Sequence, residues 1–150
     1  AGRQRRDMAQ AGDRLRWCAG NAETLPFDRA SADVVTIAFG LRNVTDRDAA
    51  IAEAYRILRP GGRFLCLEFS QVSNAMLARL YDGWSFNVLP RLGQLVAGDA
   101  DSYRYLVESI RTFPAPEILA DMFAAAGFAQ VRVRRLSGGI ACIHSGWKLD

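Results

Sequence analysis

The sequence DVVTIAFGLRNVTD, residues 33–46, decides the fold class of this chain. Residues 33–38 form a nearly continuous apolar run, which is typical of a parallel strand buried in a sheet. Thr45 and Asp46 have the side chains of a helix N-cap, and apolar residues follow them at helical spacing. The stretch therefore predicts a strand, a short polar connection and a helix. A plain strand-to-helix turn needs a cap and a glycine, but it does not need Arg42.

Strands and helices alternate over the rest of the chain. The helix after residue 46 is predicted to end at RPGG, because proline cannot continue a helix and glycine turns the chain. Further predicted elements are strands at residues 15–19, 63–70, 130–136 and 140–149, and helices at residues 74–96, 101–113 and 115–128. Gly138 and Gly139 join the last two strands and indicate an antiparallel pair. This order predicts an open α/β sheet, mostly parallel, that closes with a C-terminal antiparallel pair.

Three loops are candidate binding sites, because ligands of open α/β sheets bind beyond the carboxyl ends of the strands. They are GNAETLPF (residues 20–27), FGLRNVTD (residues 39–46) and EFSQ (residues 68–71). Two of them contain polar side chains that a simple turn does not require.

The composition is that of one globular domain. Of 150 residues, 50% are hydrophobic, and no apolar stretch approaches the roughly 20 residues that span a bilayer. No signal peptide is recognisable, so the predicted location is the cytoplasm. The net charge of +3 comes from scattered arginines without interleaved aromatic residues, so we expect no nucleic-acid partner. Cys18, Cys66 and Cys142 are predicted to be buried thiols, and no metal site is expected.

Several segments resemble the class I S-adenosylmethionine-dependent methyltransferases, and among them the ubiquinone/menaquinone biosynthesis C-methyltransferase family. They are GNAETLPFD, SADVVTIAFGLRNVTD, AYRILRPGGRFLCLEFS, DADSYRYLVESIRTFP and GIACIHSGWK. LRPGG occurs in many methyltransferases, whereas FGLRNVTD and DADSYRYLVESIRTFP are specific to the quinone branch. The resemblance extends from about residue 15 to the C-terminus. It implies a Rossmann-like sheet, S-adenosylmethionine as cofactor, and a polyprenyl benzoquinol or naphthoquinol whose ring carbon is methylated.

Two features of that family have no counterpart here: its glycine-rich first loop and the acidic end of its second strand. We therefore interpret residues 1–150 as a partial methyltransferase domain that lacks the first two βα units and is part of something longer. The strand at residues 15–19 would then have no neighbour, and the strand at residues 33–38 would have an unpaired edge. An apolar edge invites pairing with another chain. Three alternatives follow: the missing units exist elsewhere, the chain associates as a homo-oligomer or with other quinone-biosynthesis proteins, or it is poorly folded alone.

For the cofactor, the resemblance implies contacts from the first two loops. Asn21 and Ala22 match the position where a polar side chain and the next backbone N–H meet adenine. The structural alternative is an asparagine that caps the turn after a strand. Ala38 and Phe39 end the strand beneath the cofactor.

Arg42 and Asn43 are the candidate catalytic residues. Carbon methylation of a quinol requires the ring carbon to attack the sulfonium methyl, and loss of a hydroxyl proton makes the ring nucleophilic enough. A cation near that oxygen stabilises the phenolate and orients a water that takes the proton. Arg42 suits this role because its guanidinium stays charged and offers a rigid fork of donors. The alternative is an arginine that pairs with a nearby acid to hold the loop.

Asp101, Tyr103 and Trp84 are the candidate substrate-binding residues. Asp101 is alternatively a helix cap, and Tyr103 and Tyr105 are two apart on a helix, so at most one lines the pocket. Trp84 belongs to an apolar helix that forms either a channel for the polyprenyl tail or ordinary core. A lipid tail implies peripheral contact with the inner face of the cytoplasmic membrane.

Two other titratable residues have structural interpretations. His144, the one histidine in the sequence, is expected to be a structural residue of the last strand, with a role near the substrate as the alternative. Glu68 is expected to brace a loop, with lining of the pocket as the alternative. For the whole chain, two other functions stay open: a methyltransferase for another small acceptor, and a non-catalytic fragment that only folds or associates.

Overall fold

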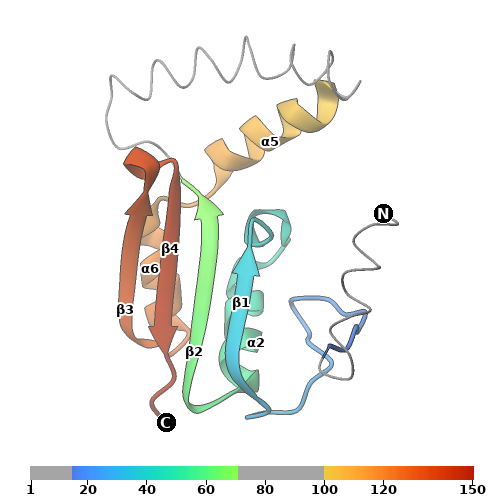
Figure 1. The fold of residues 1–150 in the computed structure, drawn as a ribbon, viewed down its shortest axis with the longest axis vertical. Coiled ribbons are helices and arrows are strands. Elements are labelled where there is room, and N and C mark those ends of the chain that lie inside the picture. The colour runs from blue at the N-terminus through green and yellow to red at the C-terminus, as the bar shows by residue number, and fades with distance from the viewer. Residues whose placement is uncertain (1–14, 71–99) are drawn as a thin grey trace.

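The structure is a computed structural model that describes residues 15–70 and 100–150. In these ranges four strands form one sheet in the order β1-β2-β4-β3 (Figure 1). The strands are β1 (Ala32–Ala38), β2 (Leu58–Phe69), β3 (Ala129–Leu136) and β4 (Ala141–Trp147). β1 and β2 pair in parallel, and β4 is antiparallel to both of its neighbours. Of the four described strands, β4 alone therefore runs against the others, which confirms a mostly parallel sheet with a C-terminal antiparallel pair.

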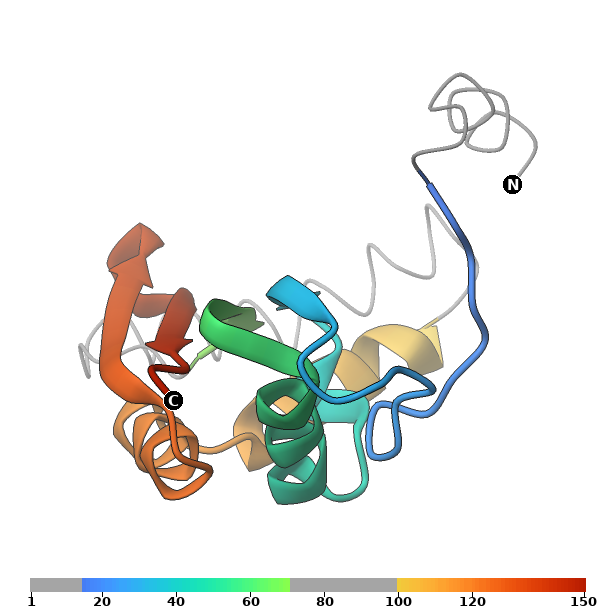
Figure 2. The same cartoon turned by 90° about the horizontal axis from the view of Figure 1, so that it is seen from below.

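The described helices are η2 (Leu41–Asn43), α2 (Arg47–Ile57), α5 (Ala100–Thr112), α6 (Pro116–Ala125) and η3 (Ser137–Gly139). α2 and α6 pack on one face of the sheet, whereas η2 and η3 lie at the ends of strands. Figure 2 shows α2 and α6 side by side beneath the strands. η2 lies at the carboxyl end of β1, and α5 contacts it there (Figure 1). The predicted helix at residues 74–96 lies outside the described residues.

The core lies between the sheet and helices α2 and α6. Phe64 of β2 stacks on Phe123 of α6 with ring centroids 4.9 Å apart, and Phe128 packs against both rings. Ile51 and Leu119 are fully buried beside them. Burial of such side chains contributes about 1.5–3 kcal/mol each, so this layer stabilises most of the described fold.

Local signals placed two helices correctly. The Asp46 carboxylate accepts a hydrogen bond from the backbone N–H of Ala49 at 3.0 Å, which confirms it as the N-cap of α2. Pro116 lies in the first turn of α6, and Gly127 follows the helix with φ +102°, a conformation that favours glycine. Ile118, which is apolar and lies in the segment predicted as a helix at residues 115–128, is exposed.

Two strand predictions were wrong. Residues 15–19 form no strand, because no other described strand lies beside them to pair with their backbone. As a result Cys18, predicted to be buried, is exposed. β2 begins at Leu58 rather than at residue 63, because the backbone of RPGG pairs with the end of β4. Gly61 N–H donates to Lys148 O at 2.7 Å, and Lys148 N–H donates to Gly62 O at 2.9 Å.

β1 is the edge strand of the described sheet, as predicted. Val35 and Ile37 pack against the core, whereas Val34, also predicted to be core, is 55% exposed. Successive side chains of a strand point to opposite faces, and only one face of β1 is covered by the helices.

Candidate functional site

The loop at residues 20–27 is tied to the start of α2 by Glu23. Its Oε1 accepts hydrogen bonds from the backbone N–H groups of Thr45 and Asp46, both at 3.1 Å. A carboxylate is favourable there because a helix N-terminus has unpaired donors and partial positive charge. Sequence reasoning missed Glu23. The sequence offered one signal for it: Glu23 is an acidic residue in one candidate loop, and the next candidate loop ends at the start of a helix, where a carboxylate is favourable.

Asn21 forms a tight turn within that loop. Its Oδ1 accepts from the backbone N–H of Glu23, and its backbone carbonyl accepts from Thr24 N–H, both at 3.1 Å. These two hydrogen bonds match the alternative interpretation of Asn21 as a residue that caps a turn. Because Oδ1 is used in the turn, the amide nitrogen of Asn21 is the group left to bond the edge of an adenine. The next residue, Ala22, packs against the core.

Arg42 and Glu68 form a buried ion pair between the candidate loops after β1 and β2. Arg42 Nη1 lies 3.2 Å from Glu68 Oε2, and the backbone N–H of Arg42 donates to Oε1 at 3.3 Å. The Glu68 side chain is 1% exposed and that of Arg42 is 12% exposed. The Arg42 guanidinium also lies 5.5 Å above the ring of Phe69. Glu68 is expected from the sequence to brace a loop, and the alternative for Arg42 is a pair with an acid that holds the loop. The Arg42–Glu68 contact corresponds to both of these interpretations.

The same guanidinium holds the backbone at Phe39. Arg42 Nη1 also donates to the carbonyl of Phe39, which has a φ of +53°. A bulky residue in this left-handed region costs about 1–3 kcal/mol and is found where the surroundings enforce it. The Phe39 ring packs against Phe69 at 4.5 Å between centroids, and Phe39 N–H donates to Leu67 O at 2.9 Å. The strained residue follows Ala38, the exposed last residue of β1.

Asn43 contacts a tyrosine of α5. Tyr105 Oη donates to Asn43 Oδ1 at 3.1 Å, across 62 residues of sequence. Asp101 and Tyr103 lie in the first turn of α5, which begins at Ala100, so Asp101 is not its N-cap. Trp84 lies outside the described residues. The structure thus brings Asn43 together with the tyrosine that was not selected from the sequence.

His144 is in the middle of β4, away from these loops, and is 2% exposed. Its Nε2 lies 2.9 Å from the carbonyl of Pro116, which can only accept, so the neutral ring carries its proton there. Burial lowers the pKa of His144 below its ordinary value, although the bond to Pro116 opposes this shift. Within the described part of the chain, Nδ1 has no partner. These contacts are those of a structural histidine.

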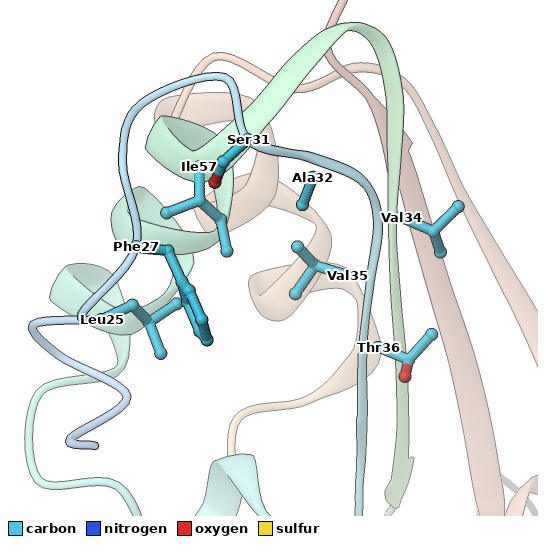
Figure 3. Close-up of a pocket in the computed structure, with 8 residues that line it drawn as sticks. All are labelled: Leu25, Phe27, Ser31, Ala32, Val34, Val35, Thr36 and Ile57. Carbon is cyan, nitrogen blue, oxygen red and sulfur yellow. The ribbon is translucent and has the colours of Figure 1, made fainter. Parts of the chain in front are cut away.

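An apolar hollow of about 440 Å³ lies beside the amino-terminal half of β1 (Figure 3). Its lining residues are Leu25, Phe27, Ser31, Ala32, Val34, Val35, Thr36 and Ile57. Figure 3 shows Val34 and Val35 projecting to opposite sides of the strand. Leu25 and Phe27 belong to the candidate loop at residues 20–27, but neither Asn21 nor Ala22 of that loop lines the hollow. The described residues contain no cluster of potential metal ligands and no helix long and apolar enough to cross a bilayer.

Several solved structures with this arrangement of strands and helices are described as methyltransferases. A SAM-dependent methyltransferase of Thermotoga maritima aligns with a TM-score of 0.60 and 24% identity over 86% of this chain and 61% of that one. PigF, solved with SAH, aligns with a TM-score of 0.61 and 18% identity over 98% of this chain and 44% of its own. These likenesses show the fold alone. It is the Rossmann-like fold of class I SAM-dependent methyltransferases.

The chain belongs to the ubiE/COQ5 methyltransferase family, whose model matches residues 1–148. It is 58% identical over 148 residues to the ubiquinone/menaquinone biosynthesis C-methyltransferase UbiE of Cereibacter sphaeroides. It is 56% identical to the mitochondrial 2-methoxy-6-polyprenyl-1,4-benzoquinol methylase of Danio rerio. Each match covers 99% of this chain, but 59% of the first protein and 45% of the second. The chain therefore spans about half the length of these relatives.

Proposed function

We propose that this chain supplies the acceptor side of a SAM-dependent methyltransferase that methylates a ring carbon of a polyprenyl benzoquinol or naphthoquinol. The observation that carries the proposal is the loop from Phe39 to Asn43. It is held at the carboxyl end of β1 by the buried Arg42–Glu68 pair. Membership of the ubiE/COQ5 family and the names of its relatives support the choice of acceptor.

The described residues fit the adenosine side of the cofactor. Asn21 has an amide nitrogen directed from a fixed turn, and the strained carbonyl of Phe39 is held at the end of β1. S-adenosylmethionine, when bound, supplies an electrophilic methyl group on sulfur. None of the residues that the resemblance selects is assigned to its ribose or methionyl parts.

The residues of this chain act on the acceptor ring. The positive charge of Arg42 favours loss of a proton from a ring hydroxyl, and the Asn43 amide donates to the resulting oxygen. With the cofactor bound, the ring carbon would accept the methyl group, and the sulfur would leave with the electron pair of the carbon–sulfur bond. The proton on that ring carbon passes to water or to a nearby base, and the aromatic ring is restored.

The polyprenyl tail of the acceptor also bears on where the protein acts and on what it contacts. Quinols with polyprenyl tails reside in membranes, so we propose peripheral contact with the inner face of the cytoplasmic membrane. The apolar segment around Trp84 would receive the tail. The outer edge of β1, which no other strand of residues 15–70 and 100–150 pairs with, supports association with a second copy or with another protein of quinone biosynthesis.

A non-catalytic fragment is the second candidate function. The observation in its favour is the exposure of apolar side chains beside β1, among them Phe27 at 48% and Val34 at 55%. Single exposed apolar residues are ordinary, but several beside an open strand edge indicate a surface that associates.

Transfer of labelled methyl groups to a demethylated, short-tailed quinol tests the proposal. The assay compares this chain with a chimera in which it replaces the 148 matched residues of the Cereibacter sphaeroides relative. We expect the chimera to yield the C-methylated quinol. A chimera that binds S-adenosylmethionine but methylates only other small acceptors contradicts the proposed substrate. A chimera that binds no cofactor supports the second candidate.

A further inference from the structure

We propose that Tyr105 is a positioning residue of the acceptor site, which orients the Asn43 amide toward a hydroxyl-derived oxygen of an aromatic ring. This inference rests on the proposed function and deepens it. It starts from the hydrogen bond of 3.1 Å between Tyr105 Oη and Asn43 Oδ1, which joins α5 to η2.

The contact determines which way the amide faces. A carboxamide oxygen only accepts hydrogen bonds and its nitrogen only donates, so a hydroxyl that donates to Oδ1 holds the oxygen toward α5. The Asn43 NH2 group is then directed away from α5. The phenol oxygen of Tyr105 keeps its own capacity to accept. Together the two side chains offer one donor and one acceptor, which suits a ring that carries hydroxyl or phenolate oxygens.

The rest of η2 is already fixed, which leaves the Asn43 side chain as the group that needs orienting. Arg42 is held by Glu68 and by the carbonyl of Phe39. Its own carbonyl accepts from Arg47 Nη2 at 3.4 Å. Asn43, the last residue of η2, is exposed, and its backbone N–H donates to Gly40 O at 3.0 Å. A second element is therefore required to select one orientation of its amide, and Tyr105 is placed to do so.

Tyr105 also remains open to a ligand. Its side chain is 57% exposed even though its hydroxyl is bonded to Asn43. A tyrosine that only fastened α5 to the sheet would gain more from burying its ring. The pair lies at the carboxyl end of β1, where ligands of open α/β sheets bind.

The test is a double-mutant cycle of Tyr105→Phe and Asn43→Ala, with kcat measured in the chimera. Loss of one donor to a developing oxyanion costs about 10²–10³-fold in kcat, which is the loss expected for Asn43→Ala. Tyr105→Phe keeps the ring and removes the hydroxyl. We expect it to lower kcat about tenfold with an unchanged Kd for S-adenosylmethionine. Because Tyr105 acts through Asn43, the double variant should be no slower than Asn43→Ala alone.

Tyr55→Phe is the matched control. Tyr55 lies in the last turn of α2, outside the proposed machinery, and its hydroxyl donates to the Asp150 carboxylate at 3.0 Å. It should leave kcat unchanged. The inference is overturned if the double variant loses kcat by the product of the two single losses. It is also overturned if Tyr105→Phe leaves kcat unchanged.

A second readout does not depend on turnover. In the ¹⁵N-labelled 150-residue chain, Tyr105→Phe should shift the side-chain amide signals of Asn43, and Tyr55→Phe should not. If neither protein methylates a quinol, the proposed function fails, and this measurement still tests the contact. Unmoved amide signals in Tyr105→Phe would overturn the positioning role by themselves.

Discussion

Strands β1 and β2 have similar apolar sequences but different surroundings. β2 has a neighbour on each side, and every second side chain from Phe64 to Glu68 is buried against the helices. Among the strands that the structure describes, β1 has a neighbour on one side only, and its Val34 is 55% exposed. An apolar run thus predicts a strand, but its burial depends on which neighbours are present. The residues with candidate chemistry lie where the loops after these two strands meet.

The largest expected difference between the strands is in core substitutions. Phe64→Ala in β2 removes a ring that is 2% exposed and stacked on Phe123, so it should lower the free energy of unfolding by about 3–5 kcal/mol. Val34→Thr in β1 should change it by less than about 0.5 kcal/mol. Urea denaturation of both variants measures this contrast. Equal losses would mean that β1 is covered in solution, as an oligomer through its edge would cover it.

The two ion pairs at opposite ends of β1 and β2 should differ nearly as much in their contribution to the free energy of unfolding. Arg42→Ala leaves Glu68 buried and unpaired, so we expect a loss of about 3 kcal/mol in the free energy of unfolding. Arg59 and Asp33 also join β2 to β1, at 2.9 Å, but both side chains are more than half exposed. Arg59→Ala should therefore cost less than about 1 kcal/mol. An Arg42→Ala variant as stable as Arg59→Ala would show that the buried pair does not hold the loop.

The smallest expected effect is a pH dependence that comes from β4. Burial lowers the pKa of His144 in the folded chain, so below about pH 6.5 the unfolded chain binds the proton more readily. The free energy of unfolding should fall as the pH drops through this value, by at most about 1.4 kcal/mol per pH unit. His144→Gln should remove the slope between pH 5.5 and 6.5. A slope that persists in this variant would assign it to other groups.

Local rules predicted the parts of the fold that depend on adjacent residues. Asp46 as a cap, Gly127 as a helix stop and the pair of strands around Gly138 are signals of neighbouring backbone. The predictions for residues 15–19 and Val34 were wrong because burial and pairing depend on elements far along the chain.

The candidate site shows the same division. The position of the loop after β1 followed from the order of strands, and the resemblance selected Arg42 and Asn43. Their partners Glu68 and Tyr105 are 26 and 62 residues away, and no spacing rule connects them. Glu23 is bonded to the start of α2 from yet another loop. Such contacts are set by the packing of the sheet, so only the folded chain shows them.

The central claim is that this chain holds the acceptor side of a methyltransferase site and only part of the cofactor site. Calorimetric titration of S-adenosylmethionine into the 150-residue chain, beside the chimera with the Cereibacter sphaeroides relative, tests it most directly. We expect no measurable binding to the 150-residue chain and micromolar binding to the chimera. Micromolar binding to the 150-residue chain would contradict the claim, because the cofactor site would then be assembled from these residues alone.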